Sequence, residues 1–229
     1  MFAQRRVLGA LRQRLPAAVQ ARQATNGFAG SDLENQLRPI LKLMGYYGKD
    51  STRARNASEI IRSCAEQSAR PEFHTDGGVV QEFRPMHMVT FLHVWMVHRR
   101  LHAFNDEHRG EGRLMQELAF DELWEETSTR IRKTGIAEIT LNKHLTDVQK
   151  YSFASAQQFD QALTFDEPAE VHDNLAAAMW RTVYLGDEKI TSDKCEGLAT
   201  YSLEQLAMLN TIDPKDIMVG KFQWKKPKF

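Results

Sequence analysis

The sequence predicts an all-α protein: a single helical domain of about seven to nine helices around a buried central helix, with basic extended termini. In the segment 86–101, ten of sixteen residues are apolar and spread nearly all round a helical wheel, as in a helix buried on most sides. Elsewhere apolar residues recur at three- and four-residue spacing, whereas no run alternates persuasively as a strand does. A chain of 229 residues with 42% hydrophobic content can also form a substantial core.

The arm of residues 1–31 is expected to target the protein to mitochondria. It carries five arginines and no acidic residue, and Leu8, Leu11 and Leu15 recur at helical spacing, which is typical of a mitochondrial transit segment. A basic tail without a targeting role is the alternative. Since the last nine residues add four lysines and no acid, the body over 32–220 holds 21 basic and 30 acidic residues. Basic ends on an acidic body indicate targeting or contact with an anionic partner.

The helices of the domain 32–186 are predicted from apolar spacing and from the positions of Pro and Gly. Pro85 lies where the central helix would begin, because a missing N–H costs nothing in a first turn. Gly135 and Gly186 are natural helix stops. In order, we expect helices over 33–47 (interrupted at Pro39) and 56–69, a loop over 70–84, the central helix over 86–101, and helices over 113–133, 136–151, 154–163 and from 168 to a stop at Gly186.

The inward faces of these helices give the expected core. The helix over 113–133 has an apolar stripe through Leu114, Leu118, Leu123 or Trp124, and Ile131. His93 lies in the most apolar part of the central helix, which favours a hydrogen-bonded core histidine over a ligand. The residues assigned to the structural core are Phe91, Leu92, His93, Trp95, Leu118, Leu175 and Trp180.

The region 187–229 is expected to form a C-terminal helix and a basic-aromatic tail. Ser202 and Gln205 have the spacing of a capping box, so a helix is predicted to begin there. Asp213 and Pro214 are predicted to form a turn.

The residues that could carry chemistry form no catalytic or metal-binding pattern. His98 and His102 are four apart on one helical face, which is compatible with zinc, but the pattern supplies no third ligand. The acidic residues over 117–126 have the spacing of a solvated helix face. The sequence has neither a Gly-x-Ser-x-Gly nucleophile turn nor a Gly-rich phosphate loop. We therefore expect no enzymatic activity, no metal and no cofactor.

Two further observations bound the class of protein. Cys64 and Cys195 are far apart and in no motif, which argues against a disulfide scaffold and fits a reducing compartment. No run of eighteen apolar residues is present, so no transmembrane helix is predicted.

The two basic ends are the predicted partner-binding segments. The tail over 221–229 interleaves aromatic residues with four lysines, a mixture that can meet an anionic membrane surface, RNA phosphates or a protein. A frayed, solubilising terminus is the alternative. We expect the tail to be mobile alone and ordered when bound. The residues assigned to partner binding are Arg5, Arg6, Arg12, Phe222, Trp224, Lys225 and Lys226.

Four segments together resemble the ubiquinol–cytochrome c chaperone family of mitochondrial assembly factors. The most specific is 91–97, Phe-Leu-His-Val-Trp-Met-Val, followed by Arg99, Arg100 and Leu101. The others are Leu-Met-Gly-Tyr-Tyr at 43–47, Arg-Ile-Arg with Gly-Ile over 130–136, and Asn-Leu-Ala-Ala-Ala-Met-Trp-Arg at 174–181. The chain departs from the family pattern where Tyr-Ser-Phe-Ala at 151–154 replaces Tyr-Gly-Arg, and where Arg-Thr at 181–182 replaces Arg-Asn.

The resemblance implies an all-helical, non-enzymatic protein that assists cytochrome b in entering respiratory complex III. It implies a peripheral position on the matrix side of the mitochondrial inner membrane, protein partners in the complex or its assembly intermediate, and nucleic acid only indirectly through the mitochondrial ribosome. Anionic lipid contact through the basic termini is a further expectation. The alternative function is a permanent accessory subunit of a respiratory complex or ATP synthase that reuses the same fold.

Overall fold

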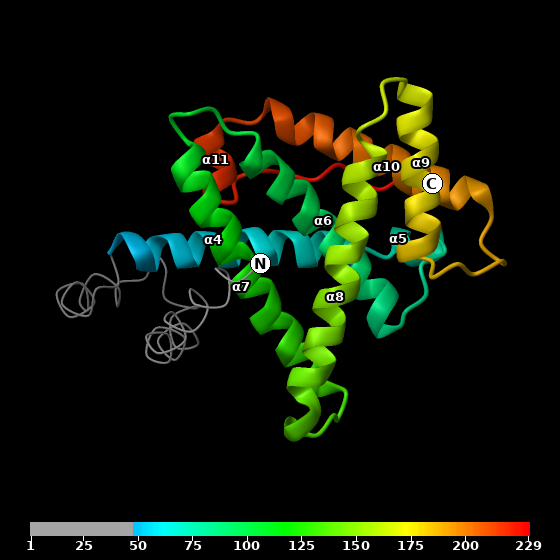
Figure 1. Ribbon diagram of the computed structural model, residues 1–229, viewed down its shortest axis with the longest axis horizontal. Coiled ribbons are helices and arrows are strands. Elements are labelled where there is room, and N and C mark those ends of the chain that lie inside the picture. Colours follow the sequence, from blue (N-terminus) through cyan, green and yellow to red (C-terminus); the bar gives the residue numbers. More distant parts are fainter. Residues whose placement is uncertain (1–47) are drawn as a thin grey trace. The chain divides into compact units, whose positions relative to one another are not determined.

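The computed structural model describes residues 48–229 of the chain. Residues 56–229 form one compact unit. The sequence predictions for the basic arm 1–31, including Arg5, Arg6 and Arg12, and for a helix over 33–47 lie outside the described residues. The described part contains the helices α4 (Lys49–Ser68), α5 (Glu72–Thr75), α6 (Phe83–His102), α7 (Arg109–Lys133), α8 (Glu138–Ala162), α9 (Pro168–Thr182), α10 (Ser192–Thr211) and α11 (Pro214–Met218) (Figure 1).

The all-α fold class is confirmed, because the described residues form helices and connections and no strand. The prediction of a central helix is also confirmed. α6 packs against α7, α8, α10 and α11, and thirteen of its twenty residues are buried. Pro85 lies in its first turn, as expected. Among residues 48–229, no helix has the length and apolar content needed to cross a membrane.

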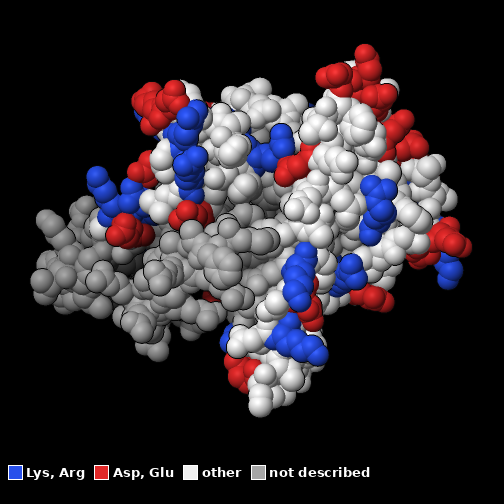
Figure 2. All heavy atoms as spheres, in the orientation of Figure 1, with Lys and Arg blue, Asp and Glu red and all other residues white. Residues whose placement is uncertain are grey.

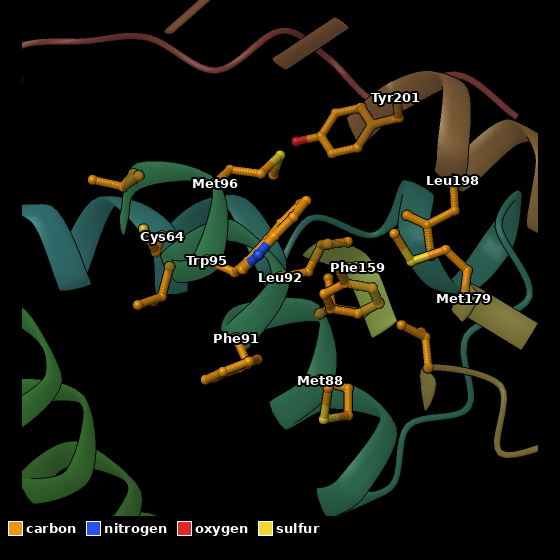
Figure 3. Packing of buried hydrophobic residues seen from close by; sticks show 14 of the residues in the cluster. Cys64, Met88, Phe91, Leu92, Trp95, Met96, Phe159, Met179, Leu198 and Tyr201 are labelled. Atoms are coloured by element: carbon orange, nitrogen blue, oxygen red, sulfur yellow. The ribbon is translucent and has the colours of Figure 1, made fainter. Parts of the chain in front are cut away.

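The core surrounds α6 and receives side chains from α4, α7, α8, α9 and α10, several of which are drawn in Figure 3. Of the expected core residues, Phe91, Leu92, His93, Trp95 and Leu175 are buried. Leu118 is only half-buried and packs at the edge of the core. Trp180 is 37% exposed on the outer side of α9, where its Nε1 donates to the carbonyl oxygen of Asp187 at 3.1 Å, so its assignment to the core is corrected.

The buried stripe of α7 is rotated from the predicted one. Leu114 is not buried, and the residues that face the core include small and polar side chains that an apolar pattern does not reveal. Gln116, for example, is buried because its Nε2 donates to the carbonyl oxygen of His98 at 2.9 Å. The buried residues of α7 are Gly112, Met115, Gln116, Ala119, Leu123, Thr127, Ser128 and Ile131.

Two boundaries in the second half of the chain were predicted wrongly. The expected separate helices over 136–151 and 154–163 are one continuous helix, α8, because no Gly or Pro interrupts residues 138–162. Ser202 does not begin a helix but lies inside α10, where its Oγ donates to the carbonyl oxygen of Leu198 at 2.7 Å. A serine within a helix can satisfy its hydroxyl on the preceding turn, so its spacing from Gln205 indicates no cap here.

The start of α11 explains the Asp-Pro pair that was predicted to form a turn. Asp213 is the N-cap of α11, and its carboxylate accepts a hydrogen bond from the Lys215 N–H at 2.8 Å. Pro214 follows in the first turn, where its missing N–H is tolerated.

Charge is unevenly distributed over the described helices. Figure 2 shows acidic side chains gathered at the α6–α7 connection and at the α8–α9 connection. By sequence these acids are Asp106, Glu107 and Glu111, and Asp166, Glu167 and Glu170. Since α7 and α8 form an antiparallel pair, both connections lie at the same end of that pair, away from the α7–α8 turn.

Two histidines of α6 are buried as neutral groups. The Nδ1 of His93 donates to the carbonyl oxygen of Val89 at 2.7 Å, and its Nε2 accepts from the Tyr201 hydroxyl at 2.8 Å. The Nδ1 of His87 accepts from Arg130 at 3.2 Å, and its Nε2 donates to Ser152 Oγ at 2.9 Å. Burial lowers the pKa of His93 to about 4 and the pKa of His87 to about 3, where the Arg130 charge adds to the effect.

These histidines predict a loss of stability in mild acid. A histidine whose pKa is lower in the folded state favours folding above its unfolded pKa of about 6.5 and opposes it increasingly as the pH falls toward the folded value. Between pH 7 and pH 5, His93 alone is expected to reduce the free energy of unfolding by about 2 kcal/mol. Urea unfolding at a series of pH values should show this slope, and His93→Gln should flatten it. The matched control is His102→Gln, which removes a histidine from an exposed position of the same helix. Equal slopes in all three proteins would contradict the assignment.

Candidate protein-interaction surface

The C-terminal tail, predicted to be a mobile partner-binding segment, is instead part of the fold. The indole Nε1 of Trp224 donates to Ser63 Oγ at 3.0 Å, and its ring meets the His93 ring edge to face, with centroids 4.8 Å apart. Phe222 packs edge to face against Trp224 with centroids 5.3 Å apart. These aromatic side chains are therefore occupied within the domain, and the expectation of a free tail is wrong.

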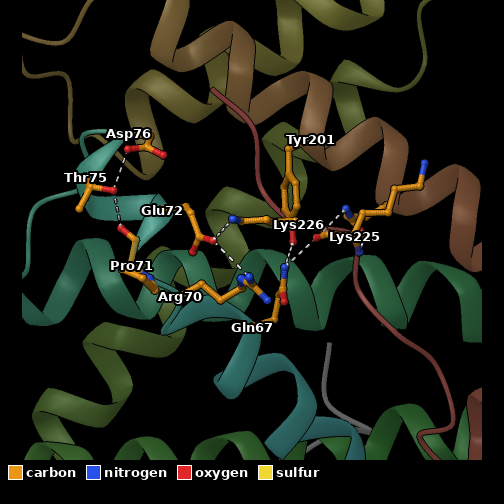
Figure 4. A network of polar contacts seen from close by, with 10 residues as sticks. Gln67, Arg70, Pro71, Glu72, Thr75, Asp76, Tyr201, Lys225 and Lys226 are labelled. Carbon is orange, nitrogen blue, oxygen red and sulfur yellow. Dashed lines mark hydrogen bonds and ion pairs between the residues drawn. The ribbon is translucent and has the colours of Figure 1, made fainter.

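The backbone of the tail is also held in place, by hydrogen bonds to side chains of α4 and α10. The Lys225 N–H donates to Gln205 Oε1 at 3.0 Å, and the Lys225 carbonyl accepts from Gln67 Nε2 at 2.9 Å (Figure 4). The same Gln67 amide donates to the Tyr201 hydroxyl at 2.8 Å. Both glutamines are buried, so the tail satisfies polar groups that would otherwise lack partners.

The lysine side chains of the tail remain at the surface in ion pairs. Lys226 Nζ lies 3.2 Å from Glu72 Oε1, and Lys225 Nζ lies 3.7 Å from Glu204 Oε2. Hydrogen bonding from Arg70, with a smaller contribution from Lys226, lowers the pKa of Glu72 to about 2. Lys225 and Lys226, which the sequence analysis assigned to partner binding, therefore form ion pairs within the domain.

The side chain of the last residue, Phe229, packs closely against the backbone at two glycines. A Cβ at Gly77 would lie 2.7 Å from the Phe229 ring, and a Cβ at Gly197 would lie 3.1 Å from it, so both positions leave room for Phe229. The Phe229 ring also meets the ring of buried Phe73, with centroids 5.8 Å apart. Gly77, expected only as part of a loop, thus allows the close approach of the C-terminal ring.

The candidate metal and acid–base residues do not assemble into a site. His98 is partly buried against Phe120, with ring centroids 5.1 Å apart, and burial lowers its pKa. No group of three possible metal ligands occurs among residues 48–229. In the acidic segment 117–126, partial burial raises the pKa of Asp121 and of Glu126, although Glu126 lies 3.7 Å from Arg130.

An apolar hollow of about 180 Å³ opens between the segment leading into α6 and the connection from α9 to α10. We call it the α6–α9 hollow. Two of its lining residues are among the most exposed large apolar side chains in the described part of the chain: Val80 at 48% and Leu185 at 41%. Its lining residues are Val80, Glu82, Pro85, Val183, Tyr184, Leu185, Asp187 and Ile190.

Leu185 is held in an unusual backbone conformation at this hollow. Its φ is +57°, a left-handed value that residues other than Gly, Asn and Asp rarely adopt, and Gly186 follows at +73°. The turn is fixed because the Gly186 N–H donates to the carbonyl oxygen of Trp180 at 2.9 Å. Such strain costs about 1 kcal/mol or more and persists only where the surroundings enforce it, often at functional positions.

A hydrogen bond joins the two walls of the hollow, and the charged residues of its lining are acidic. The Tyr184 hydroxyl donates to the carbonyl oxygen of Gly77 at 2.8 Å, which ties the end of α9 to the segment leading into α6. Glu82 and Asp187 are the charged residues of the lining, and both are acidic. The surface can therefore receive an apolar side chain from a segment that also carries positive charge. It brings together no nucleophile and base that could perform catalysis.

Sequence reasoning did not find this hollow because its two halves are 100 residues apart in short connections. Each half carries a signal in hindsight. Val79 and Val80 are an apolar pair in an otherwise polar loop, and Tyr184 and Leu185 precede a helix-stopping Gly186. Neither signal predicts that the two segments meet.

Comparison with known proteins gives consistent similarities. The family model for “Ubiquinol-cytochrome C chaperone” matches residues 76–224. The ubiquinol-cytochrome c reductase complex assembly factor 1 of Mus musculus is 26% identical over 176 residues, which cover 74% of this chain and 54% of the mouse protein. Protein CBP3, mitochondrial, of Saccharomyces cerevisiae is 24% identical over 156 residues, covering 68% of this chain and 44% of the yeast protein. The match therefore spans about half the length of each relative.

A solved structure shares the fold. The crystal structure of the Cbp3 homolog from Brucella abortus superposes with a TM-score of 0.66, covering 82% of this chain and 97% of that chain. The sequence identity is 16%, so this likeness shows the fold alone.

Proposed function

This chain belongs to the ubiquinol-cytochrome C chaperone family, whose model covers residues 76–224, and from that premise we propose that it assists the assembly of ubiquinol–cytochrome c reductase. The resemblance read from the segment 91–101 is confirmed by this match. In this role the chain binds a subunit of the complex during assembly and performs no catalysis. It works without a cofactor, in mitochondria, at the periphery of the inner membrane on its matrix side.

The observation that carries the binding role is the α6–α9 hollow, which lies inside the region that the family model matches. A chaperone for a membrane subunit needs an accessible apolar surface that holds its client reversibly. Leu185 and Val80 offer such a surface, and Glu82 and Asp187 favour a client whose apolar segment is flanked by Lys or Arg. Cytochrome b is the client that the family resemblance implies.

The alternative is a permanent accessory subunit of a respiratory complex or ATP synthase. The two roles differ in stoichiometry, since a subunit remains in the finished complex and a chaperone leaves it. Purification of tagged protein in mild detergent would separate them. Co-purification with a substoichiometric assembly intermediate supports the chaperone, whereas stoichiometric recovery with a mature complex supports the subunit.

The variant Leu185→Gly tests the hollow without damaging the fold. Glycine accepts the left-handed backbone readily, so the relief of strain offsets the greater freedom of the unfolded chain, and stability should change by less than about 1 kcal/mol. Loss of the apolar side chain should lower recovery of the client in a pull-down and reduce the level of assembled complex. The matched control Val219→Gly removes an exposed apolar side chain on a different surface and should leave client recovery unchanged. Full client recovery with Leu185→Gly would contradict the assignment of this hollow.

A further inference from the structure

The turn that joins α7 to α8 is stabilised by its own small hydrophobic cluster. Ile131 at the end of α7 is buried together with Leu141 and Val148 of α8, apart from the main hydrophobic cluster. The Arg132 guanidinium spans the turn in a paired contact with Glu138, and both nitrogen–oxygen distances are 3.1 Å. The end of this hairpin is therefore ordered by side-chain contacts on both helices, although its surface residues are exposed.

Ile139 is displayed at this end rather than packed within it. The side chain is 93% exposed, the highest value among the large apolar residues of the described region. The small core takes Leu141 and Val148 and leaves Ile139 in the first turn of α8 facing solvent. Its neighbours Ala137 and Thr140 are also exposed and uncharged, so the very end of the hairpin can approach an apolar phase closely.

Basic residues surround this exposed apolar end. Residues 130–150 carry five basic and two acidic side chains, while the described chain outside this segment holds 18 basic and 26 acidic residues. Figure 2 shows basic side chains along the lower part of the hairpin and uncharged atoms at its lower end. Lys133 and Lys143 are exposed and form no ion pair with another residue of the region 48–229. Their charges are thus available to an external partner.

The opposite end of the same helix pair is acidic, so the hairpin is electrically polarised. The connections before α7 and after α8 carry the six acidic residues described above; Arg109 and Arg113 adjoin the first group, and no Lys or Arg adjoins the second. Each helix has 25 residues, so these charges are separated by roughly 35 Å along the axis. An anionic surface attracts the basic end and repels the acidic end, which orients the hairpin with Ile139 foremost.

We propose that the end of the α7–α8 hairpin is a membrane-contact site for a bilayer that contains anionic lipid. Ile139 inserts among the acyl-chain boundaries, and Lys133 and Lys143 contact lipid phosphates. A protein partner fits less well, because stable protein interfaces bury a cluster of apolar residues in a complementary surface, whereas here one isoleucine projects from a convex turn. Single-stranded RNA binding relies on aromatic stacking, and residues 132–143 contain no aromatic side chain.

One isoleucine and a few basic residues give weak and reversible attachment. Such attachment suits a protein that meets a membrane-embedded client and leaves it. The inference is independent of the α6–α9 hollow, because the hollow and the hairpin end share no residue.

Vesicle flotation of the full chain tests the proposal. The probe is a vesicle of phosphatidylcholine with phosphatidylglycerol, compared with phosphatidylcholine alone. We expect binding to the anionic vesicles that weakens as salt rises, and a loss of about tenfold in affinity for Ile139→Asp and for the double variant Lys133→Ala, Lys143→Ala. The matched double variant Lys189→Ala, Lys215→Ala removes two lysines elsewhere in the described chain and should bind as the unaltered protein does.

A dye attached at Ile139→Cys provides a second readout that other basic segments of the chain cannot produce. The native Cys64 and Cys195 are buried, so labelling should favour the new position. Blue-shifted dye emission on adding anionic vesicles would support insertion. Dye emission that stays water-like while the protein floats would show attachment through another segment and overturn the proposal. So would hairpin variants that float normally but lose a protein partner in a pull-down.

Discussion

Deleting residues 222–229 is expected to unfold the domain or to lower its melting temperature sharply. The deletion removes Phe222, Trp224 and Phe229 from their places against the core, and it leaves the buried amides of Gln67 and Gln205 without their partners on Lys225. A fully buried large aromatic side chain contributes about 3–5 kcal/mol on truncation, so each of these half-buried rings contributes less, and each unsatisfied buried polar group adds about 1–3 kcal/mol. Together these losses approach the whole free energy of unfolding of an ordinary domain, about 5–15 kcal/mol.

Circular dichroism during heating would measure this effect. A matched control is the double variant Lys221→Ala, Lys228→Ala, which removes half of the positive charge of the tail and no aromatic ring. That variant should melt within a few degrees of the unaltered protein, since surface substitutions change stability little. A shortened protein that melts normally would restore the interpretation of the tail as a mobile arm.

The tail shows why composition misled the sequence analysis. Four lysines among nine residues suggested a solvated end, but an extended chain places alternate residues on opposite sides. Phe222 and Trp224 share one side and turn toward the core, while Gln223 and Lys225 face outward. The period of two was present in the sequence and would have predicted a packed segment, although not the helices that receive it.

The central helix was predictable because its signal is local. Residues 86–101 are apolar on nearly every side, and only burial among other helices accommodates that pattern. The hollow at Leu185 and Val80 could not be predicted in the same way. It depends on where two connections meet in space and on a left-handed residue that no local pattern required.

The inward face of α7 was misplaced for a related reason. Its buried residues include Gln116, Thr127 and Ser128, whose polar character hides them from an apolar periodicity. Trp180 was assigned to the core, whereas it lies exposed on α9.

Replacing Trp95 tests the central helix directly. Trp95 is 2% exposed, and its ring contacts Phe159 of α8 with centroids 5.1 Å apart. Its Nε1 donates to Asp160 Oδ1 at 3.0 Å, an oxygen that also accepts from Arg99 at 2.7 Å. The side chain therefore joins α6 to α8 through both apolar contact and a hydrogen bond.

Trp95→Ala is expected to lower the free energy of unfolding by about 3–5 kcal/mol, because it leaves a cavity between α6 and α8. Trp95→Phe should cost clearly less, since the ring contact with Phe159 is largely kept and Asp160 retains Arg99 as a partner. The matched control is Trp180→Ala, which removes the same side chain from an exposed position and should cost less than Trp95→Ala. Urea unfolding of the three variants would measure the order. If Trp95→Ala were no more destabilising than Trp180→Ala, α6 would not be the helix on which the domain depends, because the buried indole would then contribute no more than one at the surface.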